Sequence, residues 1–237
     1  MRVLVVEHES DSGIGLLGER LAATGARTDT FTPATGIPRS AAGYDAVISL
    51  GSAHSVMRLG ASAWFAAEQA LLGDAIGRHV PILGVCFGAQ SLAVVLGGAV
   101  TRASTPEVGW KMIDSTEAST IAEGPWFQWH EDAITAPPGA EVLATSDICL
   151  QAFRCGPHLG VQFHPEVSAQ QAADWSDDDP GGLAASGCSR QELVALTEDL
   201  LPDALRRAAD LWDEFVRGSA AVRGPIGAGT PGATGVR

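Results

Sequence analysis

Cys86 is the residue with the strongest chemical signature, because it lies in GVCFG (84–88), a G-x-C-x-G pattern that follows the apolar run PILGV. In the matching serine pattern, the nucleophile occupies a sharp strand-to-helix turn, and the glycines avoid collisions where the backbone doubles back. The N-terminus of the following helix favours the thiolate. Free cysteine is also among the most buried residue types. The pattern alone therefore leaves a nucleophile and a small core residue as two open interpretations.

His164 and Glu166, in GVQFHPEV (160–167), supply the base and the orienting group that a thiolate nucleophile needs. Pro165 biases His164 toward an extended conformation, in which residues two apart project to the same side. By itself, HPE is the pattern of a strand-to-helix turn with Glu166 near the start of the next helix. The cysteine pattern upstream favours the chemical interpretation.

Acyl transfer also needs two donors for the oxyanion. The N–H of Phe87, directly after the nucleophile, is the first. The loop SLGSAHSV (49–56) leaves a predicted strand at the same edge of the sheet, and the N–H of Gly51 or Ser52 is the candidate for the second. On this loop alone, an ordinary Gly-Ser turn is the competing interpretation.

The elements that would position these residues alternate between strand and helix. Apolar runs predict strands at 2–6, 26–31, 44–50 and 81–85, and helical spacing predicts helices at 16–25, 62–79 and 87–98. Residues 166–217 are helical again, with Pro202 breaking a helix or starting a new one. Between 99 and 163, the short pieces predicted to be extended are AVTRA, VGWKMID, EVLATS, ICLQAFRC and HLGVQF. The fold class is therefore α/β, an open and mostly parallel sheet that is mixed in its second half and flanked by helices.

Gly13, Gly15 and Gly18 spell GxGxxG, which can mark a dinucleotide site. Seven residues separate the strand from this turn, and the acidic residue expected after the second strand is missing, because TPATGIP (32–38) has none. A flexible loop is the favoured interpretation.

Composition excludes several classes of function. The chain has 28 acidic and 15 basic residues and a formal net charge of −13, which argues against nucleic acid or an anionic membrane as a partner. No signal peptide or spanning run is evident, so we expect a cytoplasmic protein. The four cysteines are Cys86, Cys149, Cys155 and Cys188. They form neither a CxxC pair nor a zinc-binding spacing, so we expect free thiols and no metal site.

The chain divides into two segments. Residues 1–217 are expected to form the domain that carries the candidate site. Residues 218–237 are rich in glycine, proline, alanine and threonine, so they have little to bury, and a disordered tail is expected.

With these pieces in place, the sequence resembles a class I glutamine amidotransferase domain, most closely the stand-alone, GMP-synthase-like group. GVCFGAQ matches the family's G-x-C-x-G-x-Q, and HPE follows near the end of the sheet. The resemblance implies a flavodoxin-like architecture and a Cys86–His164–Glu166 triad that hydrolyses the side-chain amide of glutamine without a metal or organic cofactor. It also implies that Gln90 helps to hold the substrate. The family's frequent Gly-Gly-Pro is replaced here by Gly51-Ser52-Ala53.

Three functions remain open on these observations. The first is a glutaminase that delivers ammonia to a separate synthetase. In this case the loop 51–55 would complete the oxyanion site only when that partner is ready. The second is a hydrolase of other γ-glutamyl amides or peptides with the same triad, and the third is a non-enzymatic binding module that retains the fold. The roles of His8 and His130 are left open.

Overall fold

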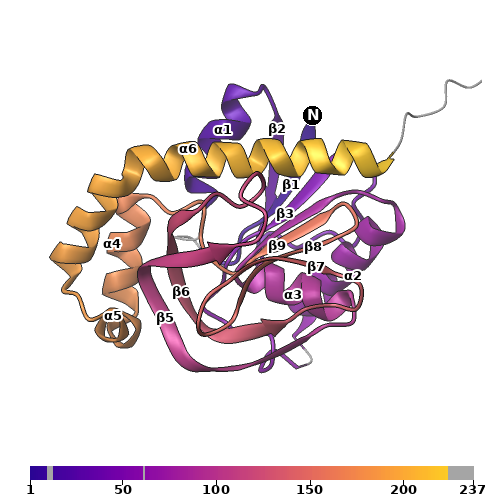
Figure 1. The fold of residues 1–237 in the computed structure, drawn as a ribbon. Helices are drawn as coiled ribbons and strands as arrows, with labels where there is room; N and C mark the ends of the chain where they lie inside the picture. Colours follow the sequence, from indigo (N-terminus) through magenta and orange to yellow (C-terminus); the bar gives the residue numbers. More distant parts are fainter. Residues whose placement is uncertain (10–12, 61, 224–237) are drawn as a thin grey trace, which may run out of the picture.

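Short, continuously apolar runs form the parallel half of the sheet. In the computed structural model, which describes residues 1–9, 13–60 and 62–223, the strand order begins β2-β1-β3-β4-β9 (Figure 1). These strands are β1 (Arg2–Val6), β2 (Arg27–Phe31), β3 (Ala46–Ser49), β4 (Ile82–Val85) and β9 (His158–Val161). All neighbours among them pair in parallel. The inner strands are buried on both faces, which explains their unbroken apolar sequences.

The second half of the sheet is antiparallel, in the order β9-β8-β7-β5-β6, so the predicted mixed α/β fold is confirmed. Its strands are β5 (Ala99–Ser115), β6 (Gly124–Thr135), β7 (Glu141–Thr145) and β8 (Leu150–Cys155). Two pieces expected to be separate, AVTRA and VGWKMID, are one strand with a register shift between Arg102 and Glu107. The partner strand β6 was not expected, and it carries residues 129–132 to the pocket described below.

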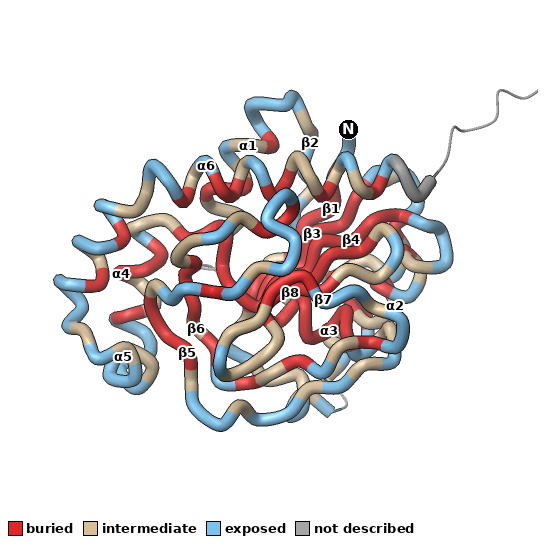
Figure 2. Tube along the Cα trace, in the orientation of Figure 1, coloured by how far each residue is buried: buried red, intermediate tan, exposed pale blue. Residues whose placement is uncertain are grey.

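Helices cover both faces of the sheet (Figures 1 and 2). They are α1 (Gly15–Ala23), α2 (Ala63–Gly77), α3 (Phe87–Val95), α4 (Ala169–Asp178), α5 (Pro180–Ser186) and α6 (Arg190–Arg223). Alternate residues of β1 point to opposite faces, so Val3 and Val5 pack with α1 and α6. Leu4 and Val6 pack with α2 and α3 on the other face. The strand order and two-sided cover are those of a flavodoxin-like fold.

The C-terminal helix corrects two expectations. Pro202 neither breaks α6 nor starts a new helix. Proline has no N–H, so the carbonyl of Glu198, four residues earlier, loses its helical hydrogen-bond donor. Both Pro202 and Glu198 are exposed, so water is available to replace that hydrogen bond. The helix also continues past the predicted boundary at Arg217 to Arg223, with Ser219 buried. Residues 224–237 lie outside the described part of the chain, so the prediction of a disordered tail stays a prediction there.

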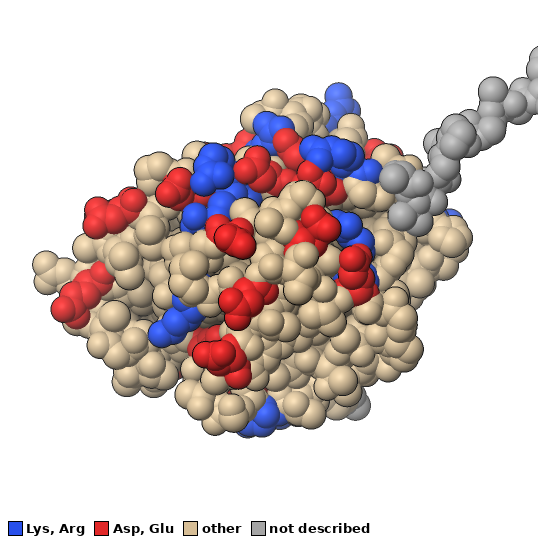
Figure 3. Space-filling view, viewed as in Figure 1, with Lys and Arg blue, Asp and Glu red and all other residues tan. Residues whose placement is uncertain are grey.

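Acidic and basic side chains are interspersed over α6 (Figure 3). Arg206 pairs with Asp203 and Asp210 along the helix, and Arg20 of α1 pairs with Asp213. Exposed pairs of this kind contribute little to stability, because solvent screens the charges. Among the described residues, no helix has the length and apolarity needed to cross a bilayer.

Candidate active site

Cys86 occupies a strained turn between β4 and α3. Its φ is 48° and its ψ is −104°, a conformation that side-chain-bearing residues rarely adopt. A Cβ on Gly84 would lie 2.6 Å from the carbonyl oxygen of Gly88, and one on Gly88 would lie 2.0 Å from that of Ser49. Both glycines are therefore required where the backbone doubles back, as the sequence pattern predicts for a nucleophile.

His164 lies beside Cys86 at the end of β9. Its Nδ1 is 2.7 Å from Oε1 of Glu166, and both side chains are almost fully buried. Burial alone would lower the pKa of His164, but the charges of Glu166 and of the Cys86 thiolate outweigh it and raise that pKa to about 10. The raised pKa favours the imidazolium form of His164. Its buried Nε2 has no hydrogen-bond partner within the described residues, and it is the nitrogen that remains to serve the thiol or a leaving group.

The segment that carries Glu166 is held by the start of α1. The N–H of Leu16 donates to the carbonyl oxygen of Glu166 at 2.8 Å. Gly15 has a φ of +44°, and a Cβ there would lie 2.0 Å from the same oxygen. The GxGxxG pattern therefore has a packing role, and the expectation of a flexible loop is wrong for Gly15 and Gly18, which belong to α1.

The three candidates for oxyanion contacts, Gly51, Ser52 and Phe87, line the same pocket as Cys86 and His164. Gly51 directly faces the reactive pair, because a Cβ there would lie 2.8 Å from Cε1 of His164 and 3.8 Å from Cβ of Cys86. The loop is also tied to the turn at Cys86, since the N–H of Gly88 donates to the carbonyl of Leu50 at 3.1 Å.

Gln90 and Gln162 form a buried amide pair next to the thiol. Nε2 of Gln90 donates to Oε1 of Gln162 at 3.4 Å, and Nε2 of Gln162 lies 3.5 Å from Sγ of Cys86. Gln90 was expected at the site from the sequence, whereas Gln162 was missed. The signal was present, because Gln162 stands two residues before His164 in an extended segment and therefore faces the same side.

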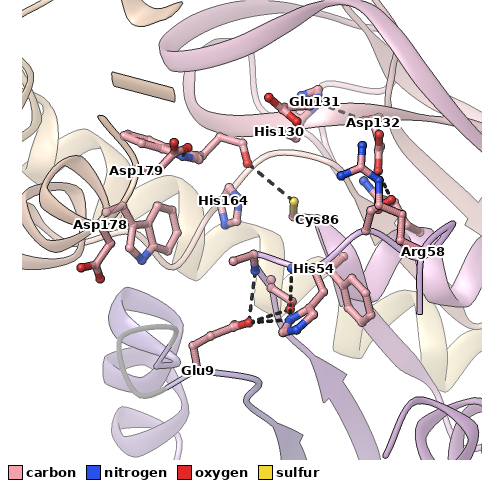
Figure 4. Close-up of a pocket in the computed structure, with 18 of the residues that line it drawn as sticks. Glu9, His54, Arg58, Cys86, His130, Glu131, Asp132, His164, Asp178 and Asp179 are labelled. Carbon is pink, nitrogen blue, oxygen red and sulfur yellow. Dashed lines mark hydrogen bonds and ion pairs between the residues drawn. The ribbon is translucent and has the colours of Figure 1, made fainter. Parts of the chain in front are cut away.

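The pocket is a cavity of about 550 Å³ with different surroundings on its two sides (Figure 4). Asp178 and Asp179 lie on the His164 side of Cys86, together with the rings of Trp129 and Trp175. On the opposite side lie Arg58 and Asp132, and Arg102 lies within ion-pair distance of Asp132 and of Glu131. The segment FQWHED (127–132) was expected from the resemblance to border the pocket, whereas Arg58 and Arg102 were not picked out from the sequence, because their separation along the chain gives no sign that they meet.

Asp132 is the most informative residue on that second side. Its Oδ2 accepts from the hydroxyl of Ser55 at 2.6 Å. Its Oδ1 is buried and accepts no hydrogen bond from the described residues, although Nη1 of Arg102 lies 3.5 Å away. A buried carboxylate oxygen without a donor is costly, which points to a ligand that supplies one.

A second cluster, Glu107, His130 and Cys149, has ligand atoms within 4.8 Å of one another, the spacing that a metal ion needs. Oε2 of Glu107 is already the acceptor for the amide of Gln151 at 2.7 Å and the hydroxyl of Ser146 at 3.0 Å. Burial, reinforced by the charge of Glu107, raises the pKa of Cys149 to about 12, which favours the thiol that lies 3.4 Å from Oε2 of Glu107 and can donate to it. The cluster is best described as a hydrogen-bonded hub that includes His130.

A match to a protein-family model establishes the family of this chain. The model for glutamine amidotransferase class-I matches residues 11–175. This chain belongs to the class I glutamine amidotransferases. The resemblance seen in the sequence is thereby confirmed, as is the expectation of an enzyme of the cysteine-dependent amidotransferase type.

Curated relatives place the chain near GMP synthases. It is 34% identical over 137 residues to a subunit of the glutamine-hydrolyzing GMP synthase of Sulfurisphaera tokodaii, covering 52% of this chain and 68% of that one. It is 32% identical over 199 residues to the glutamine-hydrolyzing GMP synthase of Anaplasma marginale, covering 74% of this chain. The match spans only 36% of the length of that longer relative.

Solved structures agree on the fold. A glutamine amidotransferase from Thermotoga maritima superposes with a TM-score of 0.83 at 24% identity, covering 91% of this chain and 98% of the other. A glutamine amido transferase from Methylobacillus flagellatus gives 0.82 at 24% identity, with 92% and 94% covered. At this level of identity the likeness establishes architecture alone.

Proposed function

We propose that this amidotransferase hydrolyses the side-chain amide of glutamine to glutamate and ammonia through a thioester on Cys86. The observation that carries the proposal is the convergence in one pocket of a strained cysteine and a histidine held by Glu166 at 2.7 Å. Family membership supports the same chemistry.

Acylation begins with the Cys86 thiolate, whose proton resides on His164. The sulfur attacks the side-chain carbonyl carbon, and the N–H groups of Phe87 and Ser52 stabilise the oxyanion. His164 then donates its proton to the departing nitrogen. The C–N bond breaks, ammonia leaves and a γ-glutamyl thioester remains on Cys86.

Deacylation returns the enzyme to its starting state. The neutral imidazole of His164 takes a proton from water, and the resulting hydroxide attacks the thioester. The C–S bond breaks, and glutamate leaves with the thiolate and the imidazolium restored. Glu166 orients His164 and stabilises its positive charge through both steps.

Substrate orientation follows from the two sides of the pocket. Gln90 and Asp132 would hold the amino-acid end of the substrate, with Oδ1 of Asp132, which accepts no hydrogen bond from the described residues, as the acceptor for its α-ammonium. Arg58 and Arg102 on the same side suit the α-carboxylate. The amide nitrogen then departs toward His164.

The ammonia released would pass to a separate synthetase. The relative from Sulfurisphaera tokodaii is named as one subunit of a GMP synthase, a name that implies a further subunit. The same arrangement for this chain is a proposal about its partner.

A γ-glutamyl amide or peptide hydrolase is the alternative, and the size of the cavity favours keeping it. At about 550 Å³, the cavity falls within the range of pockets that bind drug-sized ligands, and glutamine is smaller than these. The space beside Trp129 and Trp175 lies where an amine larger than ammonia would depart.

Labelling with 6-diazo-5-oxo-L-norleucine, a diazo-ketone analogue of glutamine, tests the proposal. Cys86 should be the labelled residue by mass spectrometry, and Cys86→Ala should abolish both labelling and glutamine turnover while the melting temperature is kept. Cys155→Ala is the matched control and should behave as wild type. Modification of Cys149, Cys155 or Cys188 instead would contradict the assignment. Steady-state rates on a panel of γ-glutamyl amides then separate the two functions.

A further inference from the structure

His8, just beyond β1, belongs to a buried hydrogen-bonded chain that reaches the candidate oxyanion loop. Its Nδ1 is 2.9 Å from the carbonyl oxygen of Gly51, and its Nε2 is 3.0 Å from Oε2 of Glu68. Oε1 of Glu68 in turn accepts from the hydroxyl of Ser49 at 2.6 Å. The side chains of His8 and Glu68 are 1% and 0% exposed. None of these contacts is used by the chemistry described above.

The direction of the bond to Gly51 follows from its acceptor. A carbonyl oxygen can only accept, so Nδ1 of His8 carries a proton and donates to it. Burial alone would lower the pKa of His8, but its hydrogen bond to Glu68 and the charge of that carboxylate outweigh burial and raise the pKa. The raised pKa favours the protonated ring, in which Nε2 also donates to Glu68. The ring is also packed against Phe87 and Trp64, with centroids 4.8 Å and 5.4 Å away.

The contact to Gly51 fixes one peptide plane. In a trans peptide, the C=O of one residue and the N–H of the next point in opposite directions, and the described chain has no cis bonds. Because the Gly51 carbonyl points to His8, the N–H of Ser52 points away from His8. Gly51 borders Cys86 and His164, and Ser52 lines their pocket.

Glu9 secures the other end of the same loop. Its Oε1 accepts from the hydroxyl of Ser52 at 2.8 Å and from the N–H of Ala53 at 3.2 Å (Figure 4). Two successive residues at the end of β1 therefore hold the loop on either side of the Ser52 N–H. All of these contacts lie within one chain, so they hold the loop without a partner chain.

We propose that His8 is a positioning residue that fixes the Gly51–Ser52 peptide with its N–H toward the oxyanion, so the oxyanion site is already formed in the free chain. The proposal rests on the proposed glutaminase function and deepens it. It replaces the sequence-based expectation that a partner must complete this loop. Glu68 acts through His8 by orienting and charging its ring.

The test compares two double variants, since removing His8 alone would leave the buried Glu68 unpaired. In the apolar variant, His8→Leu/Glu68→Met replaces the pair with apolar side chains of similar size, a change that buried ion pairs often tolerate. In the amide variant, His8→Asn/Glu68→Gln retains an amide donor near the position of Nδ1. Melting temperatures within a few degrees of wild type verify folding for both.

Two readouts separate oxyanion stabilisation from general damage. Glutamine hydrolysis passes through an oxyanion, whereas alkylation of Cys86 by iodoacetamide does not. In the apolar variant, kcat should fall about 10²–10³-fold, the loss expected for one oxyanion donor. Its KM and its alkylation rate should stay within a few-fold of wild type. The amide variant should recover most of kcat.

An unchanged kcat in the apolar variant, or equal losses in the two variants, would overturn the role of His8. A wild-type chain that is labelled at Cys86 by the diazo-ketone but does not hydrolyse glutamine unaided would overturn the preformed oxyanion site alone. A chain that is not labelled at Cys86 would overturn the proposed function itself.

Discussion

Cys86 adopts a backbone conformation that costs on the order of 1–3 kcal/mol, and a core cysteine would have no reason to keep it. Its N–H donates to the carbonyl of Val161 at 2.8 Å, which ties the turn to β9. Gly84 and Gly88 remove the side chains that would collide there. The strain supports a nucleophile over the core interpretation, because the same turn lifts the thiol toward His164.

Glu166→Gln isolates the orienting carboxylate. The amide is nearly isosteric, so the geometry should survive, but it cannot stabilise the imidazolium and it favours the wrong tautomer of His164. We expect kcat to fall about 10⁴-fold, as for the equivalent change in serine-protease triads. Steady-state glutamine hydrolysis measures it, with the exposed Glu198→Gln as control. Near-normal turnover would mean that another group orients His164.

Asp132→Asn tests recognition of the α-ammonium. Losing a charge-assisted hydrogen bond of about 1.5–3 kcal/mol should lower kcat/KM for glutamine about 10–100-fold. Glutaramate, which is glutamine without its α-amino group, should be hydrolysed equally by variant and wild type. Asp178→Asn, on the other side of the pocket, is the control. Equal losses on both substrates would exclude a contact specific to the ammonium.

At the scale of elements, the site is assembled where parallel strands end. His8 and Glu9 follow β1, Gly51 follows β3, Cys86 follows β4 and His164 follows β9. Ligands of open α/β sheets bind at these carboxyl ends. The antiparallel hairpin β5–β6 adds Arg102, Trp129 and Asp132 to the same pocket, so the mixed half of the sheet supplies the proposed substrate contacts rather than the nucleophile.

Gly15→Ala tests the contact between α1 and the Glu166 segment. The new Cβ would meet the carbonyl oxygen of Glu166, so the segment must shift, and both stability and kcat should fall. Gly25→Ala is the matched control for Gly15→Ala. Gly25 also has a positive φ, +70°, but no other atom lies near the position of the new Cβ. That control should lose only about 1–2 kcal/mol for the conformation, with kcat unchanged. Urea unfolding and kinetics measure the two effects, and identical behaviour of the variants would refute the contact.

At the scale of the whole molecule, α6 packs on one face of the sheet through apolar residues between Leu201 and Val216. Near its end, Ser219 is buried, and its hydroxyl lies 2.6 Å from the carbonyl oxygen of Phe215 in the helix and 3.1 Å from that of Pro157, in the turn between β8 and β9. The end of the helix therefore lies against the turn that leads into β9.

Truncation after Arg217 should therefore lower the melting temperature by about 2–4 °C, the shift expected for a loss near 1 kcal/mol in a protein of this size. Truncation after Arg223 should leave it unchanged, because it retains Ser219. Differential scanning calorimetry of the two truncated chains measures the difference. Equal melting temperatures would support the boundary that the composition predicts at Arg217.

The sequence alone determined the α/β class, the turn at Cys86 and the candidate partners His164 and Glu166. These features are local: G-x-C-x-G constrains one turn, Pro165 constrains its neighbour, and apolar runs report burial along each strand. Burial patterns carry no information about which distant segment provides the cover. This is why β6 was missed. The expectation that Pro202 breaks a helix or starts a new one failed because Pro202 and Glu198 are exposed, which only the structure shows.

Only the tertiary structure decided which residues support the site. Gly15 meets Glu166, His8 meets Gly51 and Glu68, and Asp132 meets Ser55 across large separations in the chain. Each contact depends on the order of the strands in the sheet, which brings the ends of β1, β3, β4 and β9 to one edge. A pattern of single residues along the chain does not encode that order, because it arises from packing between elements.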